Sequence, residues 1–460
     1  PVYFIGKEMY NRGTGLLSAA LIAILPGMFL SRSLLGFTDH HAAEVLFSTI
    51  AMLFFIIAVK SARKNEITFY SILRRDWISL KKPIIYSFLA GIFFGCYFLA
   101  WVGAPLFILI FLIYALVQHV VDHLRGKKTD YLCIVSMPFF IIPLIMIAPV
   151  VTPVLRRSPL SEFHVFSLLL GIIVFLFLTV LSFSMTRTKK IKPYWYPIAI
   201  LALGITSFIL LKVFDPSLYL TLTEALLRIF APSKTTLTLV EAQTMSWNDI
   251  WDSFTTTFFL TFAAIAWVGY NIWRKWRSEE ILLVVWSVVM LFTSLMQIRF
   301  AFYYAVNVAI LCGFLTWKII EFVSFRREEK REKEIENSRE PFKFLRADII
   351  FTIIVIGFVV FYPPLNESLA TAKLGTRGPP DDWSESLSWM RENTPDPGVD
   401  YYALYPDDYT YPESAYSVMS WLDYGHWITR IAHSIPVANP FGQGIGGPYQ
   451  EDSPGACVFF

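Results

Sequence analysis

Charged residues are scarce in this sequence. Only 16% of the 460 residues are Asp, Glu, Lys or Arg, whereas 55% are hydrophobic. The mean hydropathy of +0.53 is well above the range of water-soluble domains. This composition excludes a soluble enzyme. The formal net charge at pH 7 is only +3, so no overall electrostatic field favours a nucleic acid as partner.

Cysteine is also rare, with four residues in the whole chain. Cys96, Cys133 and Cys312 lie within apolar runs, which argues against a disulfide framework. The sequence has no visible internal repeat and no low-complexity tract. It begins at Pro1 without a basic segment and a cleavage site, so we expect the chain to be truncated or excised.

Long apolar runs dominate what is present. A bilayer core of about 30 Å requires about 20 apolar residues in a helix, and hydrocarbon cannot satisfy unpaired backbone groups. The sequence therefore predicts a mostly α, polytopic transmembrane helical bundle with eleven spans. These spans are expected near residues 14–30, 42–59, 84–101, 104–121, 131–150, 164–184, 194–211, 254–272, 281–297, 302–320 and 348–362.

Basic residues predict the orientation of the spans. Five alternate loops, which include residues 60–83 and 326–346, hold 25 of the 39 lysines and arginines. We therefore expect these loops to face the cytoplasm and the first helix to run outward. Eleven spans then place the residues after 362 outside the cell.

The last part of the chain has a different composition. Residues 363–460 hold four Lys or Arg against thirteen Asp or Glu, and they are rich in Pro, Gly, Tyr and Trp. Residues 380–392 have the spacing of a short helix, and residues 399–405 and 416–419 alternate loosely like strands. We therefore predict a transmembrane domain over residues 1–362, followed by the start of an extracytoplasmic α+β domain.

Ionisable residues gather on the predicted outer side. The first outer loop, residues 31–43, contains Arg32, Asp39 and His41, and Glu44 starts the next helix. Side chains at positions i and i+2 of an extended backbone point the same way, so Asp39 and His41 can share one ligand. A carboxylate with an imidazole suits Mn²⁺ or Mg²⁺ better than Ca²⁺. A helix-capping Asp with interfacial histidines is the alternative.

Two further ionisable residues lie on the same side. Glu241 lies in the second outer loop, residues 212–253, and loops of this length are usually functional or disordered. A solvated loop carboxylate is the alternative. Arg299 lies at the outer end of a helical hairpin, where a guanidinium can bind phosphate. A snorkelling Arg at the lipid headgroups is equally consistent with the pattern.

The tail contains a dense aromatic segment, Trp421-Leu422-Asp423-Tyr424-Gly425. Aromatic rings offer flat apolar walls with a hydrogen-bonding edge, and Asp accepts hydrogen bonds. The segment therefore favours recognition of a peptide or a sugar hydroxyl. A buried aromatic corner with a structural Asp is the alternative.

These motifs resemble those of a known family, the catalytic subunits of oligosaccharyltransferases, which transfer a lipid-linked glycan to asparagine. Residues 421–425 resemble the family's Trp-Trp-Asp-Tyr-Gly signature. Gly-Phe-Thr-Asp-His-His at residues 36–41 resembles its second acidic motif in the archaeal form, and Thr-Leu-Val-Glu at residues 238–241 resembles its Thr/Ser-x-x-Glu motif. The resemblance covers essentially the whole chain.

The resemblance implies a role for each ionisable residue. Asp39 and His41 would bind a divalent metal, Mn²⁺ or Mg²⁺, and Glu241 would close over the site and help to hold the acceptor asparagine. Arg32 matches the family's arginine beside the acidic motif. Arg299 matches the arginine that contacts the leaving lipid phosphate.

The resemblance also implies that residues 421–425 hold the hydroxyl of Ser or Thr in an Asn-x-Ser/Thr sequon, because a site built to bond a hydroxyl rejects peptides that lack one. Two departures from the family are expected to matter. Leu422 replaces the second Trp of the signature. The family has thirteen spans, so eleven spans imply that two spans and the first acidic motif are absent, together with a further C-terminal motif.

The function implied by the resemblance is N-linked glycosylation. A single-subunit membrane glycosyltransferase of GT-C type would transfer an oligosaccharide, with inversion, from dolichyl phosphate or diphosphate to the sequon asparagine. Its catalytic face would lie outside the cell membrane, and no nucleic acid would be involved. Two alternatives stay open: another lipid-phosphate-sugar-dependent glycosyltransferase of this type, and a transporter, whose site would lie near mid-membrane.

Overall fold

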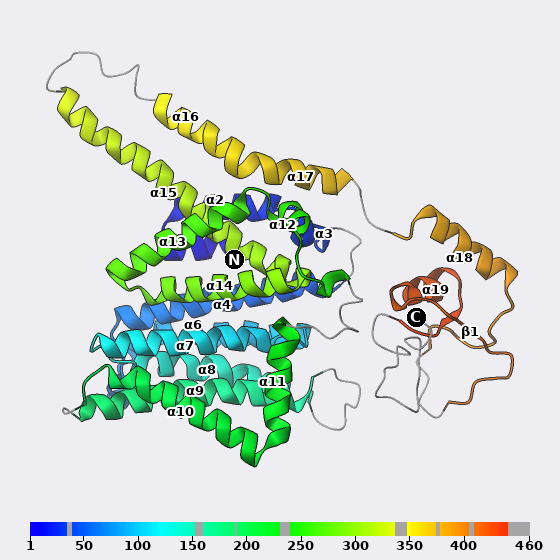
Figure 1. Ribbon diagram of the computed structural model, residues 1–460, viewed down its shortest axis with the longest axis horizontal. Helices are drawn as coiled ribbons and strands as arrows, with labels where there is room; N and C mark the ends of the chain where they lie inside the picture. Colours follow the sequence, from blue (N-terminus) through cyan, green and yellow to red (C-terminus); the bar gives the residue numbers. More distant parts are fainter. Residues whose placement is uncertain are drawn as a thin grey trace. The chain divides into compact units, whose positions relative to one another are not determined.

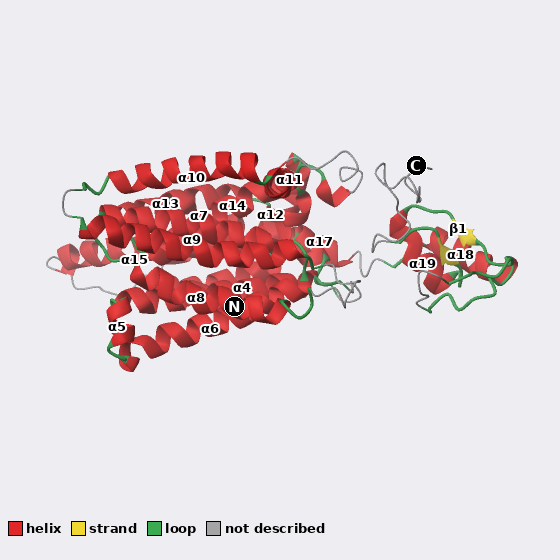
Figure 2. Ribbon diagram, turned by 90° about the horizontal axis from the view of Figure 1, so that it is seen from below, coloured by secondary structure: helices red, strands yellow, loops and turns green. Residues whose placement is uncertain are grey.

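The computed structural model divides the chain into two compact units, Pro1–Leu374 and Gly375–Phe460. Within the first unit, the long helices run side by side along a common direction (Figures 1 and 2). The described residues are 1–34, 39–151, 160–188, 191–230, 240–335, 347–373, 378–403 and 409–439.

The regular secondary structure in the described residues of the first unit is all helical, with short 3-10 or π segments between some α-helices. Its α-helices are α1 (Val2–Met9), α2 (Arg12–Ile24), α3 (Gly27–Ser31), α4 (His41–Lys64), α5 (Phe69–Leu73), α6 (Trp77–Ala100), α7 (Pro105–Leu124), α8 (Asp130–Ile147), α9 (Glu162–Arg187), α10 (Trp195–Phe214), α11 (Pro216–Phe230), α12 (Trp247–Phe254), α13 (Thr257–Lys275), α14 (Ser278–Met296), α15 (Ala301–Ile335), α16 (Ala347–Ile356) and α17 (Tyr362–Lys373). The short segments are η3 (Val240–Ala242), η4 (Ile298–Phe300) and η5 (Gly357–Phe361).

Within the described residues, nine helices are long and apolar enough to cross a membrane, and the bent pair α12–α13 makes a tenth if it forms one span. Nine of the eleven predicted segments correspond to these long helices, and a tenth falls on the bent pair. The prediction of a mostly α, polytopic transmembrane bundle is therefore confirmed.

The first predicted span, residues 14–30, is not one helix. It is divided into α2, which is only 13 residues long, and the short α3. Pro26 follows Leu25, whose φ of −70° and ψ of 126° are extended, because a residue before proline is pushed out of the helical region. Gly27 then has a φ of +64°, and a Cβ there would lie 2.5 Å from the Cα of Ser253. Only glycine fits this turn.

The predicted span over residues 254–272 also begins with a bend. Helices α12 and α13 meet at 79°, with Thr255 between them at a φ of 50°. The long loop before this bend contains α11, which the sequence did not predict. Helix α1 was also missed, and Asn11 separates it from α2 by capping Thr14 N at 2.9 Å.

An aromatic core holds α4 in place against α6, α7 and α8. Phe55 of α4, Phe94, Phe111 and Phe139 are fully buried. The ring centroids of Phe94 and Phe139 are 4.7 Å apart, and those of Phe111 and Phe139 are 4.6 Å apart. Because lipid is as apolar as these rings, their close packing rather than the hydrophobic effect holds the helices together. This core fixes the helix whose first residue is His41.

The second unit has its own small core. Its elements are α18 (Asp381–Asn393), β1 (Ser417–Val418), η6 (Leu422–Tyr424), α19 (Gly425–Ile431) and β2 (Ile435–Pro436). Leu387 of α18 packs against Ile428 and Ala432. Strands β1 and β2 are parallel, with Ser417 opposite Ile435.

The structure supports part of the prediction for this unit. The predicted helix over residues 380–392 is present as α18, and β1 lies within the predicted strand 416–419. Residues 399–403 do not form a strand, and residues 404–405 lie outside the described part of the chain. The mixed-charge segment after residue 325 continues α15 to Ile335.

Candidate active site

Five of the predicted site residues come together at one end of the first unit, where α4 and α15 begin; we call this the site end. Arg32 follows α3, Asp39 precedes α4, and His41 is the first residue of α4. Glu241 lies in η3 and Arg299 in η4. These five residues are named the Asp39 cluster below.

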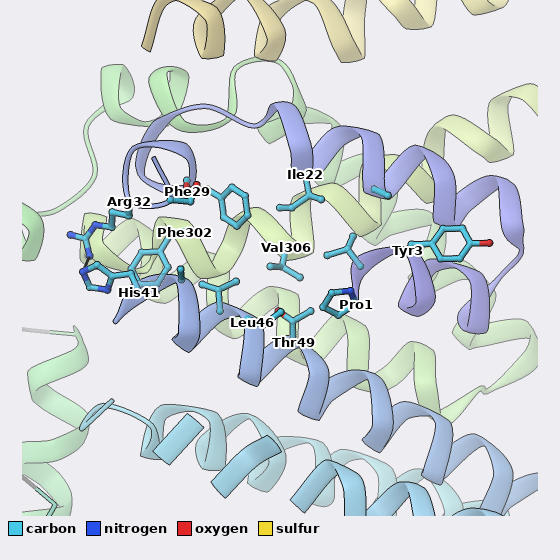
Figure 3. A pocket seen from close by; sticks show the side chains of 15 residues that line it. Pro1, Tyr3, Ile22, Phe29, Arg32, His41, Leu46, Thr49, Phe302 and Val306 are labelled. Atoms are coloured by element: carbon cyan, nitrogen blue, oxygen red, sulfur yellow. Dashed lines mark hydrogen bonds between the residues drawn. The ribbon is translucent and has the colours of Figure 1, made fainter. Parts of the chain in front are cut away.

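Arg32 joins distant parts of the chain within the Asp39 cluster. Its side chain is 9% exposed and forms an ion pair with Glu241 through Nη2. Its Nη1 lies 2.5 Å from Nε2 of His41. The guanidinium also lies over the ring of Phe302, 5.2 Å from the ring centroid, as Figure 3 shows. A planar guanidinium can make such contacts at once, which an ammonium cannot.

The contact with Arg32 defines which nitrogen of His41 carries the proton. A guanidinium only donates hydrogen bonds, so Nε2 of His41 accepts. Nδ1 then carries the hydrogen and donates it to Oε1 of Glu44, 3.0 Å away. Nε2 of His41 therefore presents a lone pair toward the Asp39 cluster.

Asp39 and His41 have the geometry of metal ligands. Oδ2 of Asp39 lies 3.1 Å from Nε2 of His41, and with His40 the three residues can each offer a ligand atom within 4.8 Å of the others. Two lone-pair atoms this close repel each other unless a cation lies between them. The donor set of one carboxylate and imidazole nitrogens suits a divalent transition metal or Mg²⁺, so the residues present fit the predicted ion.

Hydrogen bonds shift the pKa values of Asp39 and His40, the two residues before α4. Burial alone would raise the pKa of Asp39, but hydrogen bonds from the side chain and the backbone amide of His40 hold this pKa well below its usual value. Hydrogen bonds to Asp39 and Glu44 raise the pKa of His40 to about 10. Asp39 is therefore ionised at neutral pH, as a metal ligand must be.

Glu241 and Arg299 are held close by backbone pairing. The amide of Ile298 donates to the carbonyl of Gln243 at 3.0 Å, and the amide of Met245 donates to the carbonyl of Leu295 at 3.0 Å. The segment after η3 therefore runs beside the segment that carries Arg299. Arg299 lies within electrostatic range of Glu241.

An apolar pocket of about 410 Å³ adjoins the cluster. Arg32 and His41 lie at one end of it beside Phe302, and Pro1 and Tyr3 lie at the other (Figure 3). Helices α1, α2, α4 and α15 bound this pocket. The polar residues of the cluster thus border an apolar surface.

The predicted sequon-binding segment belongs to the second unit, between β1 and α19. Asp423 is exposed, whereas Trp421 and Leu422 are partly buried. Tyr424 stacks on Trp383 of α18 with ring centroids 4.2 Å apart. Tyr424 therefore supports the fold of the unit, and Asp423 is the member that faces solvent.

Gly425 has a structural reason to be glycine. A Cβ at this position would lie 2.3 Å from the carbonyl oxygen of Ala438 and 2.8 Å from the Cα of Asn439. The backbone after β2 thus packs directly on the start of α19. This close approach explains the last position of the motif without a ligand.

Sequence reasoning missed two residues that contact or support the cluster. His40 contacts Asp39, and Glu44 contacts both His40 and His41. Glu44 could have been found, since residues three apart on a helix lie on the same face. The other predicted motif positions, residues 36–38 and 238–239, lie outside the described residues.

Comparison with known proteins finds similarity to oligosaccharyltransferases. Residues 1–220 match the family model for oligosaccharyl transferase STT3, N-terminal, and residues 380–454 match the AglB core domain. Dolichyl-phosphooligosaccharide-protein glycotransferase 3 of Archaeoglobus fulgidus is 27% identical over 100% of this chain and 54% of its own length. Dolichyl-monophosphooligosaccharide–protein glycotransferase AglB of Haloferax volcanii is 25% identical over 96% of this chain and 50% of its own length.

Three solved structures of the Archaeoglobus fulgidus oligosaccharyltransferase are similar to this chain. Each is 26% identical and covers 100% of the chain. The complex of AglB with an inhibitory peptide and a dolichol-phosphate has a TM-score of 0.81 over 54% of that chain. The form tethered to an acceptor peptide with the NVT sequon has a TM-score of 0.78 over 53% of its chain. The complex with zinc and sulfate has a TM-score of 0.71 over 51% of its chain.

The chain spans about half the length of the curated relatives that it matches. Both family models, the relatives and the solved structures agree in one assignment. The chain contains domains of the STT3/AglB family, the family of these oligosaccharyltransferases.

Proposed function

We propose that this protein transfers an oligosaccharide from a dolichyl phosphate or diphosphate carrier to the asparagine amide of Asn-x-Ser/Thr sequons. The observation that carries the proposal is the convergence of Arg32, Asp39, His41 and Glu241 at the site end, where apolar helices begin. A lipid-borne phosphate and a water-soluble peptide can meet only at such a boundary. The names of the relatives, which are glycotransferases, support the same reaction.

Asp39 and His41 are the proposed ligands of the metal, Mn²⁺ or Mg²⁺. The related enzyme from Archaeoglobus fulgidus has been solved as a complex with zinc and sulfate. A bound divalent cation supplies Lewis acidity and neutralises the charge that develops on the departing phosphate. The ionised carboxylate of Asp39 and the lone pair on Nε2 of His41 provide the ligands that such an ion requires.

Arg299 is the proposed contact of the lipid phosphate. It is half-buried beside the ring of Phe300, 5.2 Å from the ring centroid, so a phosphate there would be partly shielded from water. Shielding strengthens a guanidinium–phosphate pair. Arg32 acts differently, since both its terminal nitrogens are occupied by His41 and Glu241.

The acceptor requires a separate set of residues. An amide nitrogen is a poor nucleophile because its lone pair is delocalised, so the site must hold and polarise the carboxamide. Glu241, whose side chain is 40% exposed, can accept an N–H of the asparagine amide. Attack from the side opposite the departing phosphate inverts the anomeric carbon.

The sequon hydroxyl is proposed to bind at residues 421–425, with Trp421 and Leu422 as apolar walls and Asp423 as the acceptor of its hydrogen bond. Tyr424 and Gly425 hold this segment in place through the contacts described above. We propose residues 1–362 as the transmembrane catalytic domain and residues 363–460 as an extracytoplasmic domain.

The proposed location is the cell membrane, with the site end on the extracytoplasmic side. The predicted cytoplasmic loops hold most of the lysines and arginines, as the positive-inside rule requires. A single subunit is proposed to suffice, without nucleic acid. The Asp39 cluster lies at the ends of helices rather than near their middle, which disfavours a transporter.

The test is glycosylation of an Asn-x-Thr peptide by the full-length protein in lipid, with a dolichyl-linked donor and Mn²⁺. We expect an Asn-x-Ala peptide to react at least about 10²-fold more slowly, because Asp423 would lose the hydrogen bond from the hydroxyl. Trp421→Ala should raise KM for the Asn-x-Thr peptide. Trp389→Ala is the matched control, since Trp389 lies in the same unit and is 62% exposed. Equal rates with both peptides would show that the segment does not read the hydroxyl.

A further inference from the structure

Glu44 is a fully buried carboxylate beside the Asp39 cluster. Its side chain is 0% exposed, although it lies only one turn from the beginning of α4. Oε1 accepts from Nδ1 of His41 at 3.0 Å and from Nε2 of His40 at 2.9 Å. The acid thus contacts the predicted metal ligand on the side away from Asp39.

The other carboxylate oxygen of Glu44 is fixed by a neighbouring helix. The hydroxyl of Tyr303, in α15, donates to Oε2 of Glu44 at 2.5 Å. The hydroxyl of Tyr303 lies 3.1 Å from that of Tyr97, in α6. Both tyrosines are at most 2% exposed. Three helices therefore converge on the position of one carboxylate.

We propose that Glu44, held by Tyr303, is a positioning residue that fixes the ring of His41 with Nδ1 protonated, so that the lone pair on Nε2, which here accepts from Arg32, points toward Asp39 and the proposed metal. The inference rests on the proposed metal site. An imidazole that ligates through one nitrogen needs a fixed acceptor at the other, since rotation or the opposite tautomer removes the lone pair from the ion. The carboxylate of Glu44 is the acceptor at Nδ1.

A role for Glu44 in helix stability alone does not account for this geometry. An acidic residue in the first turn of a helix interacts favourably with the helix dipole, but it does so from the surface. Burial of a carboxylate is costly unless each oxygen is hydrogen-bonded. Both oxygens of Glu44 are hydrogen-bonded, and two of the donors are the adjacent histidines. The buried carboxylate of Glu44 is therefore hydrogen-bonded to His40, which precedes α4, and to His41, the first residue of α4.

The test measures Mn²⁺ affinity of the full-length protein in lipid nanodiscs by electron paramagnetic resonance of free Mn²⁺, without donor or acceptor. We expect Glu44→Leu to weaken binding by about 10- to 100-fold. Glu44→Gln should weaken it less, because the amide oxygen still accepts from Nδ1 of His41. Tyr303→Phe, which removes only a hydroxyl, should weaken it in the same direction and should add no further loss in the Glu44→Leu background.

The matched control is Glu280→Leu. Glu280 is a carboxylate at the start of α14 that is 1% exposed and lies 3.9 Å from Arg277. We expect the Glu280→Leu substitution to lower the unfolding temperature measured without metal and to leave the Mn²⁺ affinity unchanged. An equal loss of affinity in Glu44→Leu and Glu280→Leu would overturn the inference, as would wild-type affinity in Glu44→Gln, Glu44→Leu and Tyr303→Phe.

Asp39→Ala separates this inference from the proposed function. If Asp39→Ala abolishes Mn²⁺ binding and the Glu44 variants bind normally, the metal site stands and the positioning role is refuted. If the unaltered protein binds no Mn²⁺, the metal site and the positioning role both fail.

Discussion

The two ends of the first unit bury polar residues in different ways. At the site end, Arg32 contacts Glu241 across 209 residues of sequence, and Tyr303 contacts Glu44 across 259. At the opposite end, Asp122 of α7 is 1% exposed and accepts from neighbours in the sequence. These neighbours are Gln118, at 2.9 Å, and Tyr131, at 2.7 Å.

From this difference we infer which polar group serves stability and which would serve the proposed chemistry. The carboxylate of Asp122 is bound within one helix and the start of the next, so its contacts join consecutive elements. The Asp39 cluster joins α3, α4, η3 and η4, and it leaves Asp39 37% exposed. A group that only stabilises a bundle is expected to be shielded, whereas a group that meets a substrate must remain accessible.

The largest expected effect on the glycosylation rate distinguishes Asp39 from Asp122. Asp39→Asn should reduce glycosylation of an Asn-x-Thr peptide by about 10²-fold or more, since a neutral amide is a poor ligand for a hard cation and electrostatic stabilisation is lost. Removal of the metal with a chelator should have an effect of similar size. The measurement is the initial rate at saturating peptide and donor.

Asp122→Asn is the isosteric counterpart at the opposite end. This substitution should leave the initial glycosylation rate within about twofold of that of the unaltered protein. It should lower the unfolding temperature instead, because a charge-assisted hydrogen bond is weakened. If Asp122→Asn reduced the rate as much as Asp39→Asn, the division between the two ends would be wrong.

An intermediate effect is expected for arginine. Arg32→Lys should lower kcat by about tenfold or more, because an ammonium cannot hold His41 and Glu241 in one plane. Arg125 provides the control at the opposite end, where its guanidinium lies 3.8 Å from the ring centroid of Trp276. Arg125→Lys should leave kcat unchanged, and unchanged kcat in Arg32→Lys would argue against the bridging role.

The smallest expected effect concerns Tyr131→Phe. Removal of this hydroxyl deprives Asp122 of one donor and should cost about 1 kcal/mol of stability. Glycosylation should be unaffected. The check is thermal unfolding in nanodiscs followed by tryptophan fluorescence, and a loss of activity at full stability would contradict the assignment.

Much of the bundle could be predicted from the sequence, since hydrocarbon leaves helices as the only solution for long apolar runs. The prediction fails where the backbone conformation of one or two residues breaks or bends a helix. Pro26 and Gly27 break the first span, and the bend at Thr255 shifts the start of another. Apolar composition does not reveal such turns, whereas Pro-Gly itself is a recognisable turn signal.

The site was predicted less completely than the fold. The motifs identified Asp39, His41 and Glu241, because their residue types are rare in apolar surroundings. The support from Tyr303 could not be predicted, since tyrosine at the end of a membrane helix is common at the interface. Only packing of α4 against α15 shows that its hydroxyl points at Glu44.

The backbone pairing that links residues 243–245 to residues 295–298 bears on how an acceptor peptide would enter the proposed site. Because one side of the long loop is tied to the hairpin that carries Arg299, the loop cannot swing open as a whole without breaking main-chain hydrogen bonds. Residues 243–245 are therefore expected to stay with the segment that carries Arg299 when an acceptor peptide enters the proposed site.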